Sequence, residues 1–346
     1  MIERVDVDLF DPVPTNEPPR WRAGLPQTLA TWPMGELRIV TADGHEGRAI
    51  TNRGHVLKDL VDRWLRVELV GRDALDRELL WRRMWEVDRL EYLPTHMTGP
   101  VDVALWDLAA RAAGMPLHRF LGSARDRIPA YASTATFGSV EEYLDVIDQC
   151  LAHGFRAIKL HAWGDARRDA QLAARVREHV GPDVPLMYDG SAAFDVADAV
   201  YLGDALHAQD YLWYEEPIQE YSIAAYRSLA AKTRAPLLVA EVSAGAHMNT
   251  ADFISAVSPA YVRTSAGFRG GVTGAMRIAH LADAFRIRAE VHGGGPVSRH
   301  LCLAISNTTY YESLVLSNPV IPESVVDRDG YVTAPKGPGV GWGQTA

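Results

Sequence analysis

The sequence predicts an α/β fold whose larger part is a closed (β/α) barrel. From Ile128 onward, short apolar runs alternate with amphipathic helical stretches of about ten to fifteen residues, the pattern of strand–helix units around a parallel sheet. Seven or eight such units follow one another, which favours a closed barrel over an open doubly wound sheet. No glycine-rich phosphate loop follows the first of these strands, and this argues against a nucleotide-binding fold.

A different pattern occupies the chain before residue 123 and predicts a smaller N-terminal unit. Residues 37–40 are typical of a strand that enters a turn, and helical periodicity follows in 56–69 and 72–90. A third helical segment, 100–113, is apolar on most sides and is therefore expected to be buried. At roughly 150 residues per domain, a chain of 346 residues has room for two domains.

The barrel elements are expected at regular intervals. The helical segments between strands include 139–153 and 166–180. The predicted strands are, in order, 128–132, 157–161, 185–189, 211–215, 237–241, 261–265 and 288–292, with an eighth, weaker strand near 309–314. The tail, 322–346, is rich in Gly and Pro and too short for a domain, so we expect it to pack back on the N-terminal unit.

The composition excludes several classes of protein. The chain is 47% hydrophobic and 23% charged with a formal net charge of −9, which is ordinary for a globular protein and a poor match for nucleic acid. Cys150 and Cys302 are too few for a disulfide framework. The acidic start does not resemble a signal peptide, and no apolar run approaches the ~18 residues of a membrane helix. We therefore expect a cytoplasmic protein with neither a membrane nor a nucleic-acid partner.

Three carboxylates at strand ends are the strongest functional signal. Asp189, Glu215 and Glu241 each end a predicted strand, and both intervals are 26 residues, which is one strand–helix unit. Barrel enzymes keep their chemistry at the C-terminal ends of the strands, so three consecutive strands would bring these carboxylates to one mouth. Their mutual repulsion calls for a cation, and ligand oxygens alone suit a hard divalent ion such as Mg²⁺, which keeps open positions for a substrate.

Each acid taken alone has a simpler interpretation, as a helix cap or as a partner of a surface Lys or Arg. Three acids in step on successive strands favour the metal site. Glu216 directly follows Glu215, and neighbouring residues on a strand point to opposite faces. We therefore expect Glu216 to support the metal ligands rather than to join them.

Basic side chains flank the predicted metal site. Lys159 and His161 are two residues apart on the second strand and so share a face, one strand before Asp189. His292 ends the seventh strand and precedes three glycines. We expect His161 and His292 to be catalytic, and Lys159 to act as a base or as a charge that lowers the pKa of a nearby base. The alternatives are a structural histidine inside the barrel at 161 and a simple turn after 292.

Four motifs, in this order and spacing, resemble the enolase superfamily and within it the mandelate racemase-like subgroup, the mandelate racemase/muconate lactonizing enzyme family. They are Asp102-Val103-Ala104-Leu105-Trp106-Asp107-Leu108, Ala157-Ile158-Lys159-Leu160-His161, Glu215-Glu216-Pro217 and Gly270-Gly271-Val272-Thr273-Gly274. The resemblance covers nearly the whole chain.

The resemblance implies a (β/α)7β TIM-type barrel at 124–320, an N-terminal α+β capping domain at 1–123, and a C-terminal tail, 321–346, that packs back on the capping domain. It also implies that the chain forms a homo-oligomer, that the three carboxylates are Mg²⁺ ligands, and that the base on the seventh strand is His292.

Two positions depart from the family pattern. The lysine-x-lysine of the second strand is Lys159-Leu160-His161 here, so an imidazole takes the place of the usual base lysine. The sixth-strand aspartate that partners the seventh-strand histidine falls at Ser265. Glu290 shares a strand face with His292, and one hypothesis is that it supplies the missing negative charge. The competing hypothesis is an ion pair between Arg263 and Glu290.

These features predict Mg²⁺-dependent abstraction of the α-proton of a carboxylate substrate through an enediolate intermediate. Dehydration of a sugar acid or a related hydroxy acid is the first expectation. Racemisation or epimerisation, cycloisomerisation, and metal binding without turnover are the alternatives. In the Pro-rich segment 12–26, we expect Arg20 and Arg22 to bind a substrate carboxylate through their guanidinium groups, the alternative being a solvated arm.

Overall fold

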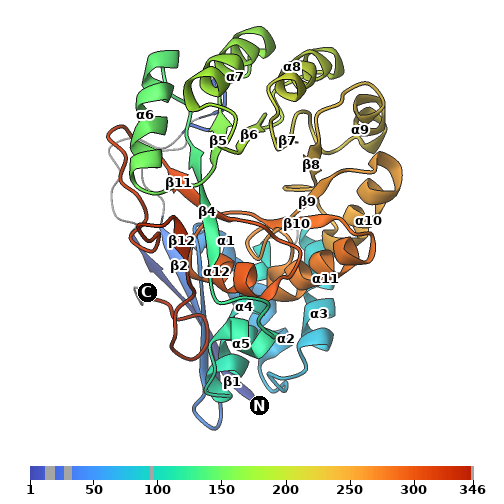
Figure 1. The fold of residues 1–346 in the computed structure, drawn as a ribbon. Coiled ribbons are helices and arrows are strands. Elements are labelled where there is room, and N and C mark those ends of the chain that lie inside the picture. The colour runs from blue at the N-terminus through green and yellow to red at the C-terminus, as the bar shows by residue number, and fades with distance from the viewer. Residues whose placement is uncertain (12–19, 27–32, 94–96, 344–346) are drawn as a thin grey trace.

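The computed structural model describes residues 1–11, 20–26, 33–93 and 97–343. These residues form a smaller N-terminal unit beneath a larger barrel (Figure 1). In that view the blue and cyan N-terminal elements lie at the bottom, while the green, yellow and orange helices surround the strands of the barrel.

Three antiparallel strands and a group of helices build the N-terminal unit. The predicted strand at 37–40 and the three predicted helices are confirmed, although 56–69 is divided by a π-helical turn. The strands, in sheet order, are β1 (Ile2–Phe10), β2 (Met34–Thr41) and β3 (Glu46–Thr51). The helices are α1 (Gly54–Leu60), η1 (Val61–Leu65), α2 (Arg66–Leu69), α3 (Arg77–Glu91), α4 (Gly99–Ala112) and α5 (Leu117–Leu121).

Eight parallel strands form the barrel, and all eight predicted strands are confirmed. Each of the first seven is followed by a helix. In chain order the elements are β4 (Ile128–Thr134), α6 (Val140–Ala152), β5 (Ile158–His161), α7 (Ala166–Val180), β6 (Leu186–Asp189), α8 (Val196–Ala208), β7 (Trp213–Glu215), α9 (Ile223–Ala230), β8 (Leu237–Val239), α10 (Ala246–Val257), β9 (Tyr261–Thr264), α11 (Gly271–Ala284), β10 (Arg288–Val291), α12 (Pro296–Ala304) and β11 (Tyr311–Val315).

The seam between β10 and β11 joins the two ends of this strand order. Ala289 donates its backbone N–H to Asn307 O at 3.0 Å. Gly293 donates its N–H to Glu312 Oε2 at 2.7 Å. Loop and side-chain hydrogen bonds thus bridge the seam, and seven strand–helix units with a final strand give the predicted (β/α)7β barrel.

The C-terminal tail contacts both the barrel and the N-terminal unit. Its short strand β12 (Tyr331–Val332) pairs with the start of β4 in antiparallel fashion. Further along, Val340 donates its N–H to Asp107 Oδ1 of α4 at 2.6 Å, and Trp342 Nε1 donates to Arg48 O at 2.9 Å. These bonds fix the last described residues against the N-terminal unit. We keep 123 and 320 as proposed domain boundaries.

Large side chains fill the barrel below the strand ends. Met187 and Trp213 each stand two residues before a carboxylate of interest and are fully buried. They belong to a buried cluster that also contains Tyr131, Ala157, Leu238 and Tyr261. Polar groups at the strand ends therefore stand above an apolar layer. None of the helices in the described part of the chain has the length and hydropathy of a membrane span.

Candidate active site

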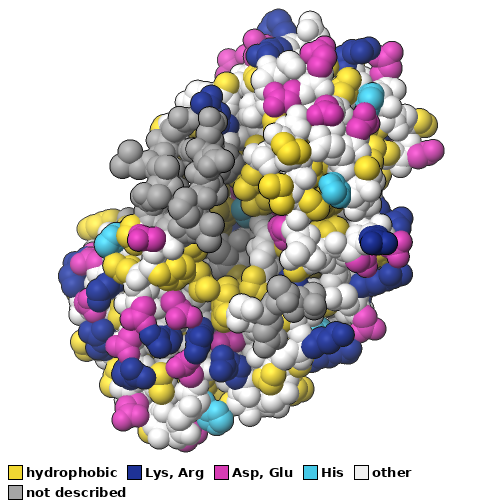
Figure 2. Space-filling view, turned by 90° about the vertical axis from the view of Figure 1, so that its left-hand side faces the viewer, with side chains coloured by type: hydrophobic (Ala, Val, Ile, Leu, Met, Phe, Trp, Pro, Cys, Tyr) yellow, Lys and Arg dark blue, Asp and Glu magenta, His cyan; other side chains and the backbone are white. Residues whose placement is uncertain are grey.

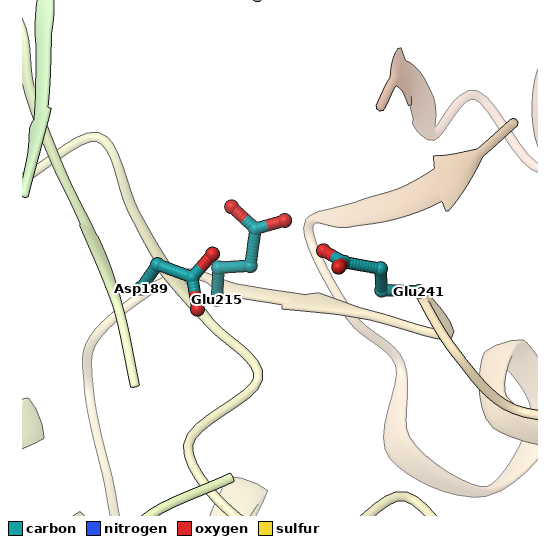
Figure 3. Close-up of side chains that lie close together, drawn as sticks. All are labelled: Asp189, Glu215 and Glu241. Carbon is teal, nitrogen blue, oxygen red and sulfur yellow. The ribbon is translucent and has the colours of Figure 1, made fainter. Parts of the chain in front are cut away.

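A row of polar side chains crosses the mouth of the barrel where β5, β6 and β7 end. His161 pairs in register with Asp189, and Asp189 pairs with Glu215. Glu241 follows β8 by two residues. Figure 3 shows Asp189 and Glu241 reaching inward on either side of Glu215. One carboxylate oxygen from each of the three lies within 4.8 Å of the others, so the predicted grouping is confirmed.

Burial of three neighbouring carboxylates costs free energy, and the positively charged side chains around them offset only part of this cost. Burial raises the pKa of Glu241 well above its usual range, and the charges of Glu215, Glu216 and Asp189 raise it further. Its Oε2 atom is buried without a hydrogen-bond partner in the described structure, and Arg263 Nε lies 3.7 Å from it. A divalent ion among these oxygens would satisfy this atom and relieve the repulsion. The donor set therefore fits Mg²⁺.

The other two carboxylates hold their charge. Burial alone would raise the pKa of Asp189, but the charges of His161 and Lys159 outweigh it and keep that pKa well below its usual range. Arg263 and Lys159 likewise outweigh burial and lower the pKa of Glu215. Asp189 and Glu215 are thus ionised and available as ligands.

Lys159 and Arg263 form a buried layer of positive charge beneath the carboxylates. Lys159 Nζ lies 3.1 Å from Asp189 Oδ2, 2.9 Å from Glu215 Oε2 and 2.8 Å from Glu312 Oε1. Burial opposes its charge, but Glu215 and Glu312 raise the pKa of Lys159 well above its usual range. A lysine held as a cation cannot accept a proton, so this geometry favours its role as an electrostatic neighbour.

Arg263 and Glu312 are site residues that the sequence interpretation missed. Arg263 Nη2 donates to Glu215 Oε2 at 2.8 Å and to Tyr131 Oη at 2.9 Å, and its Nη2 is 3.6 Å from Glu312 Oε2. The position of Arg263 on the predicted sixth strand was visible in the sequence, but its contact with Glu215, two strands away in the sheet, was not. Glu312 lies on the weakest predicted strand.

The two histidines stand on opposite sides of the carboxylates. His161 Nε2 is 3.1 Å from Asp189 Oδ2, and its Nδ1 donates to Thr134 O at 2.8 Å. His292 Nε2 is 3.2 Å from Glu241 Oε1. A molecule bound at the carboxylates would therefore have an imidazole near each of its faces.

His292 is held in its neutral form. Burial lowers its pKa to about 4, with Glu312 opposing the shift and Arg263 and Lys159 adding to it. The ring of Phe268 stacks on it with centroids 4.8 Å apart. Its imidazole is thus neutral at ordinary pH and fixed in orientation.

Both hypotheses about Glu290 are wrong. Its carboxylate accepts hydrogen bonds from Thr308 Oγ1 at 3.2 Å, Thr309 N at 3.1 Å and Thr309 Oγ1 at 2.7 Å. It forms an ion pair with neither Arg263 nor His292 in the described structure. The physical reason is the seam beside β10, where the loop before β11 offers donors close to Glu290. Strand alternation alone does not reveal such donors.

Ser265, which takes the place of the family's aspartate, shapes a turn instead of partnering His292. Its Oγ accepts the N–H groups of Gly267 at 3.1 Å and Phe268 at 3.2 Å. This turn carries the ring that stacks on His292. The negative charge near His292 comes from Glu312 and Glu215 instead.

The segment 20–26 lies against the mouth of the barrel. Thr136 donates its N–H to Arg20 O at 2.7 Å, and the Trp21 ring is 4.8 Å from the ring of His161. Arg22 Nε donates to Ser191 O at 2.9 Å, and its Nη1 donates to Ala23 O at 3.1 Å. The Arg22 side chain therefore anchors this segment, and the rest of the Pro-rich stretch, 12–19, is outside the described residues.

A buried carboxylate that the sequence interpretation missed organises the loop carrying Glu241. Glu220 accepts the backbone N–H groups of Ala240, Glu241, Val242 and Ser243. Ala240 takes the left-handed conformation with φ of 67°, which is uncommon for a residue other than glycine. Strained backbone of this kind gathers at functional sites. Glu220 follows a strand end by five residues, and no sequence signal distinguishes it from a surface acid.

A cavity of about 440 Å³ opens beside His292, between the barrel and the N-terminal unit. It is lined by the end of β3, the start of α4, the turn at 265–268 and the glycine loop before α12. Figure 2 shows a hollow between the two halves of the molecule with hydrophobic side chains at its border.

Two family models together match most of the chain. One is described as the mandelate racemase/muconate lactonizing enzyme N-terminal domain and matches residues 6–122. The other is described as the enolase C-terminal domain-like family and matches residues 142–343.

Individual proteins are similar over almost the full length. The 3,6-anhydro-alpha-L-galactonate cycloisomerase of Streptomyces coelicolor is 30% identical over 99% of this chain and 96% of its own. A D-glucarate dehydratase structure from Agrobacterium tumefaciens, complexed with magnesium, has a TM-score of 0.89 at 30% identity and covers 99% of this chain and 96% of its own. L-Talarate dehydratase from Polaromonas sp. JS666, solved with Mg and L-glucarate, has a TM-score of 0.84 at 26% identity, with coverage of 98% and 94%.

Proposed function

Because this chain belongs to the mandelate racemase/muconate lactonizing enzyme family of the enolase superfamily, we propose that it is a Mg²⁺-dependent enzyme that removes the α-proton of a carboxylate substrate. One observation carries the proposal. Three buried carboxylates converge within 4.8 Å, and an imidazole stands on each side of them.

In this proposal Asp189, Glu215 and Glu241 hold the metal ion. Bound Mg²⁺ supplies positive charge to the substrate carboxylate, which makes the adjacent C–H bond more acidic. Positive charge placed where negative charge develops stabilises the enediolate that forms on the substrate. Lys159 remains a cation and adds to this field from below.

The two histidines divide the proton transfers. His292 is neutral and takes the α-proton on one face. On the other face His161, whose Nδ1 is held by Thr134 O, presents Nε2 to the substrate. A proton given by His161 to a β-hydroxyl lets the C–O bond break and water leave, and the resulting enol tautomerises to a keto acid.

Dehydration of a sugar acid is the reaction that this arrangement supports best. The similar dehydratases act, by their names, on D-glucarate and L-talarate. Cycloisomerisation is the second candidate, favoured by the Streptomyces relative, and it needs the same first step. The product separates the two, because dehydration lowers the mass by one water and cycloisomerisation does not.

Arg20 is a substrate-binding residue on the segment that covers the mouth, and Arg22 holds that segment in place. The enzyme works in the cytoplasm. It forms a homo-oligomer, and light scattering of the purified protein measures the number of chains in it.

The test is solvent exchange. The protein with Mg²⁺ is incubated in D₂O with a set of sugar acids, and deuterium at the α-carbon and keto-acid formation are followed together. We expect both with at least one acid, a loss of exchange of about 10²- to 10⁴-fold in His292→Asn, and retained exchange without keto acid in the matched variant His161→Asn. Absence of exchange across the whole set would overturn the proposal in favour of a metal-binding relative without turnover.

A further inference from the structure

The loop that follows His292 has little rigidity of its own. Residues 293–295 are all glycine, and α12 begins directly after them at Pro296. Glycine has no Cβ and populates many backbone conformations, so three in succession would let the loop move unless other groups held it. On the side of β9 the loop is fixed, because His292 donates its backbone N–H to Thr264 O at 2.8 Å. The glycines themselves need a support from elsewhere.

Two neighbouring side chains of β11 supply this support. Gly293 donates its N–H to Glu312 Oε2 at 2.7 Å, and Gly295 donates its N–H to Tyr311 Oη at 2.8 Å. Tyr311 is fully buried, and its hydroxyl donates in turn to Glu323 Oε2 at 2.7 Å. Since Glu323 belongs to the C-terminal tail, two consecutive hydrogen bonds connect the tail to the loop after His292.

The direction of both hydrogen bonds follows from the protonation of Tyr311. Burial raises the pKa of Tyr311 well above its usual range, and the charge of Glu323 raises it further. The phenol therefore keeps its proton and donates it to Glu323, while its oxygen accepts the N–H of Gly295. Glu323 is itself held to β11, because its Oε1 accepts the N–H of Leu314 at 3.4 Å.

Gly294 packs directly against the same pair of side chains. A Cβ atom at this position would stand 2.8 Å from Glu323 Oε1 and 3.1 Å from Tyr311 Oη. The φ of Gly294 lies outside the left-handed region, so the backbone conformation alone does not call for glycine. The close approach to Tyr311 and Glu323 does. The loop thus fits against the pair in addition to being bonded to it.

We propose that Tyr311 and Glu323 are positioning residues that hold the loop after His292 and so keep the imidazole directed at the α-carbon of the substrate. The inference rests on the proposed function, which makes His292 the base. Neither residue touches the substrate, because Tyr311 acts through Gly295 and Glu323 acts through Tyr311. The tail takes part in the reaction in this way, since proton transfer depends strongly on the placement of the base.

The first test measures α-proton exchange in D₂O with Mg²⁺ and a set of sugar acids that includes D-glucarate, L-talarate and D-galactonate. With the acid that wild type exchanges fastest, we expect kcat to fall about 10- to 100-fold in Tyr311→Phe and Glu323→Ala, with KM within about twofold of wild type. Glu323→Gln keeps an oxygen that accepts the Tyr311 proton, and it should retain kcat within about threefold. A loss of stability alone would produce neither the split between kcat and KM nor the rescue by glutamine.

The second test does not depend on turnover. Hydrogen–deuterium exchange of backbone amides, followed by mass spectrometry of the peptide that contains 293–295, reports local opening of the loop. We expect this peptide to exchange at least about tenfold faster in Tyr311→Phe and Glu323→Ala than in wild type. Peptides from α6 should exchange at the wild-type rate in all variants.

The matched control is Tyr211→Phe. Tyr211 is also buried, and its hydroxyl donates to Ala173 O at 3.1 Å from a position before β7, at the end of the barrel opposite the carboxylates. We expect this variant to keep the wild-type kcat and the wild-type protection of the loop. Circular dichroism melts measure how far each variant is destabilised.

Three outcomes would overturn this inference and leave the proposed function standing. They are an unchanged kcat in both Tyr311→Phe and Glu323→Ala, equal losses of kcat in Glu323→Ala and Glu323→Gln, and unaltered amide exchange of the loop in Tyr311→Phe. Absence of α-proton exchange by wild type across the whole set of acids would overturn the proposed function and this inference together.

Discussion

The Glu220 carboxylate accepts the backbone N–H of Glu241 at 3.1 Å, so one buried acid determines where another is held. The same carboxylate binds three further amides of the loop, and Arg269 lies behind it with its guanidinium bonded to Ser243 and Thr250. The charge of Arg269 offsets part of the effect of burial on the pKa of Glu220, which is nevertheless raised. The loop that carries Glu241 is therefore rigid, and it holds Glu241 in place relative to Asp189 and Glu215.

Glu220→Gln is expected to weaken metal binding. The amide keeps the size of the side chain but replaces one acceptor oxygen by an NH₂ donor, which would face backbone N–H groups. Residues that orient metal ligands typically change affinity 10- to 100-fold when altered, and we expect a loss of that order for Mn²⁺, measured by electron paramagnetic resonance.

The matched control for Glu220 is Asp169→Asn. Asp169 accepts the N–H groups of Trp163, Gly164 and Asp165, and so supports the loop after β5 in the same manner without carrying a carboxylate of the trio. We expect lower thermal stability with unchanged Mn²⁺ affinity. Equal Mn²⁺ affinities in wild type and Glu220→Gln would show that the loop needs no such support.

Glu241→Gln is expected to stabilise the protein in the absence of metal. The substitution removes a buried carboxyl group that is costly to ionise, because its neighbours repel a negative charge there, and whose Oε2 has no hydrogen-bond partner in the described structure. We expect an increase of about 1–3 kcal/mol in the free energy of unfolding at pH 8 with EDTA, measured by urea denaturation. A decrease in the free energy of unfolding would mean that the Glu241 carboxyl group has a stabilising partner that offsets the repulsion by its neighbours.

Much of this arrangement could be predicted from the sequence. The interval of 26 residues placed Asp189, Glu215 and Glu241 on consecutive strands, because strand–helix units repeat and each strand end faces the same mouth. Alternation within β5 placed Lys159 and His161 on one face. These features depend on local periodicity and on the order of the chain.

The rest depends on distances that only packing determines. Arg263 on β9 reaches Glu215 on β7, past the strand between them, and Glu290 bonds to the threonines of a loop 18 residues further along the chain. Glu220 meets the loop of Glu241 from a neighbouring turn. No periodic pattern marks such contacts, and none marks the hydrogen bond from Arg22 to the backbone of another loop.

Gly339→Ala is expected to destabilise the contact between the tail and α4. Gly339 has φ of 79°, and a Cβ atom there would stand 2.2 Å from Asp107 Oδ1, the acceptor for Val340. We expect a loss of about 2–4 kcal/mol in the free energy of unfolding, from the left-handed backbone and from overpacking together. The control is Gly343→Ala, where φ is 76° but no atom lies within 4 Å of the added carbon. Similar losses of unfolding free energy in the two variants would show that the tail can shift to accommodate the added carbon at 339 without a further loss of stability.

Asp102 is expected to make stability depend on pH. Burial raises its pKa to about 7, although hydrogen bonds from Thr273 oppose the shift. The folded protein thus holds this proton more tightly than the unfolded chain, whose aspartates titrate near pH 4. The contribution of the protonated group is fully present below about pH 4 and is lost as the pH rises through about 7.

Urea denaturation of Asp102→Asn measures this effect, since the variant cannot titrate. The change in hydrogen bonding shifts its stability by an amount independent of pH. Relative to the variant, wild type should lose free energy of unfolding between pH 4.5 and pH 8, at up to about 1.4 kcal/mol per pH unit. Parallel pH profiles would contradict the raised pKa.

Binding of a divalent ion to the metal-free protein tests the central claim most directly. Titration with Mn²⁺, followed by electron paramagnetic resonance and competed with Mg²⁺, should give one ion per chain in wild type and at least about tenfold weaker binding in Glu241→Gln. The control Glu290→Gln, which alters a buried carboxylate bonded to Thr308 and Thr309, should bind as wild type does. Wild type without a bound ion, or Glu241→Gln with undiminished affinity, would contradict the account.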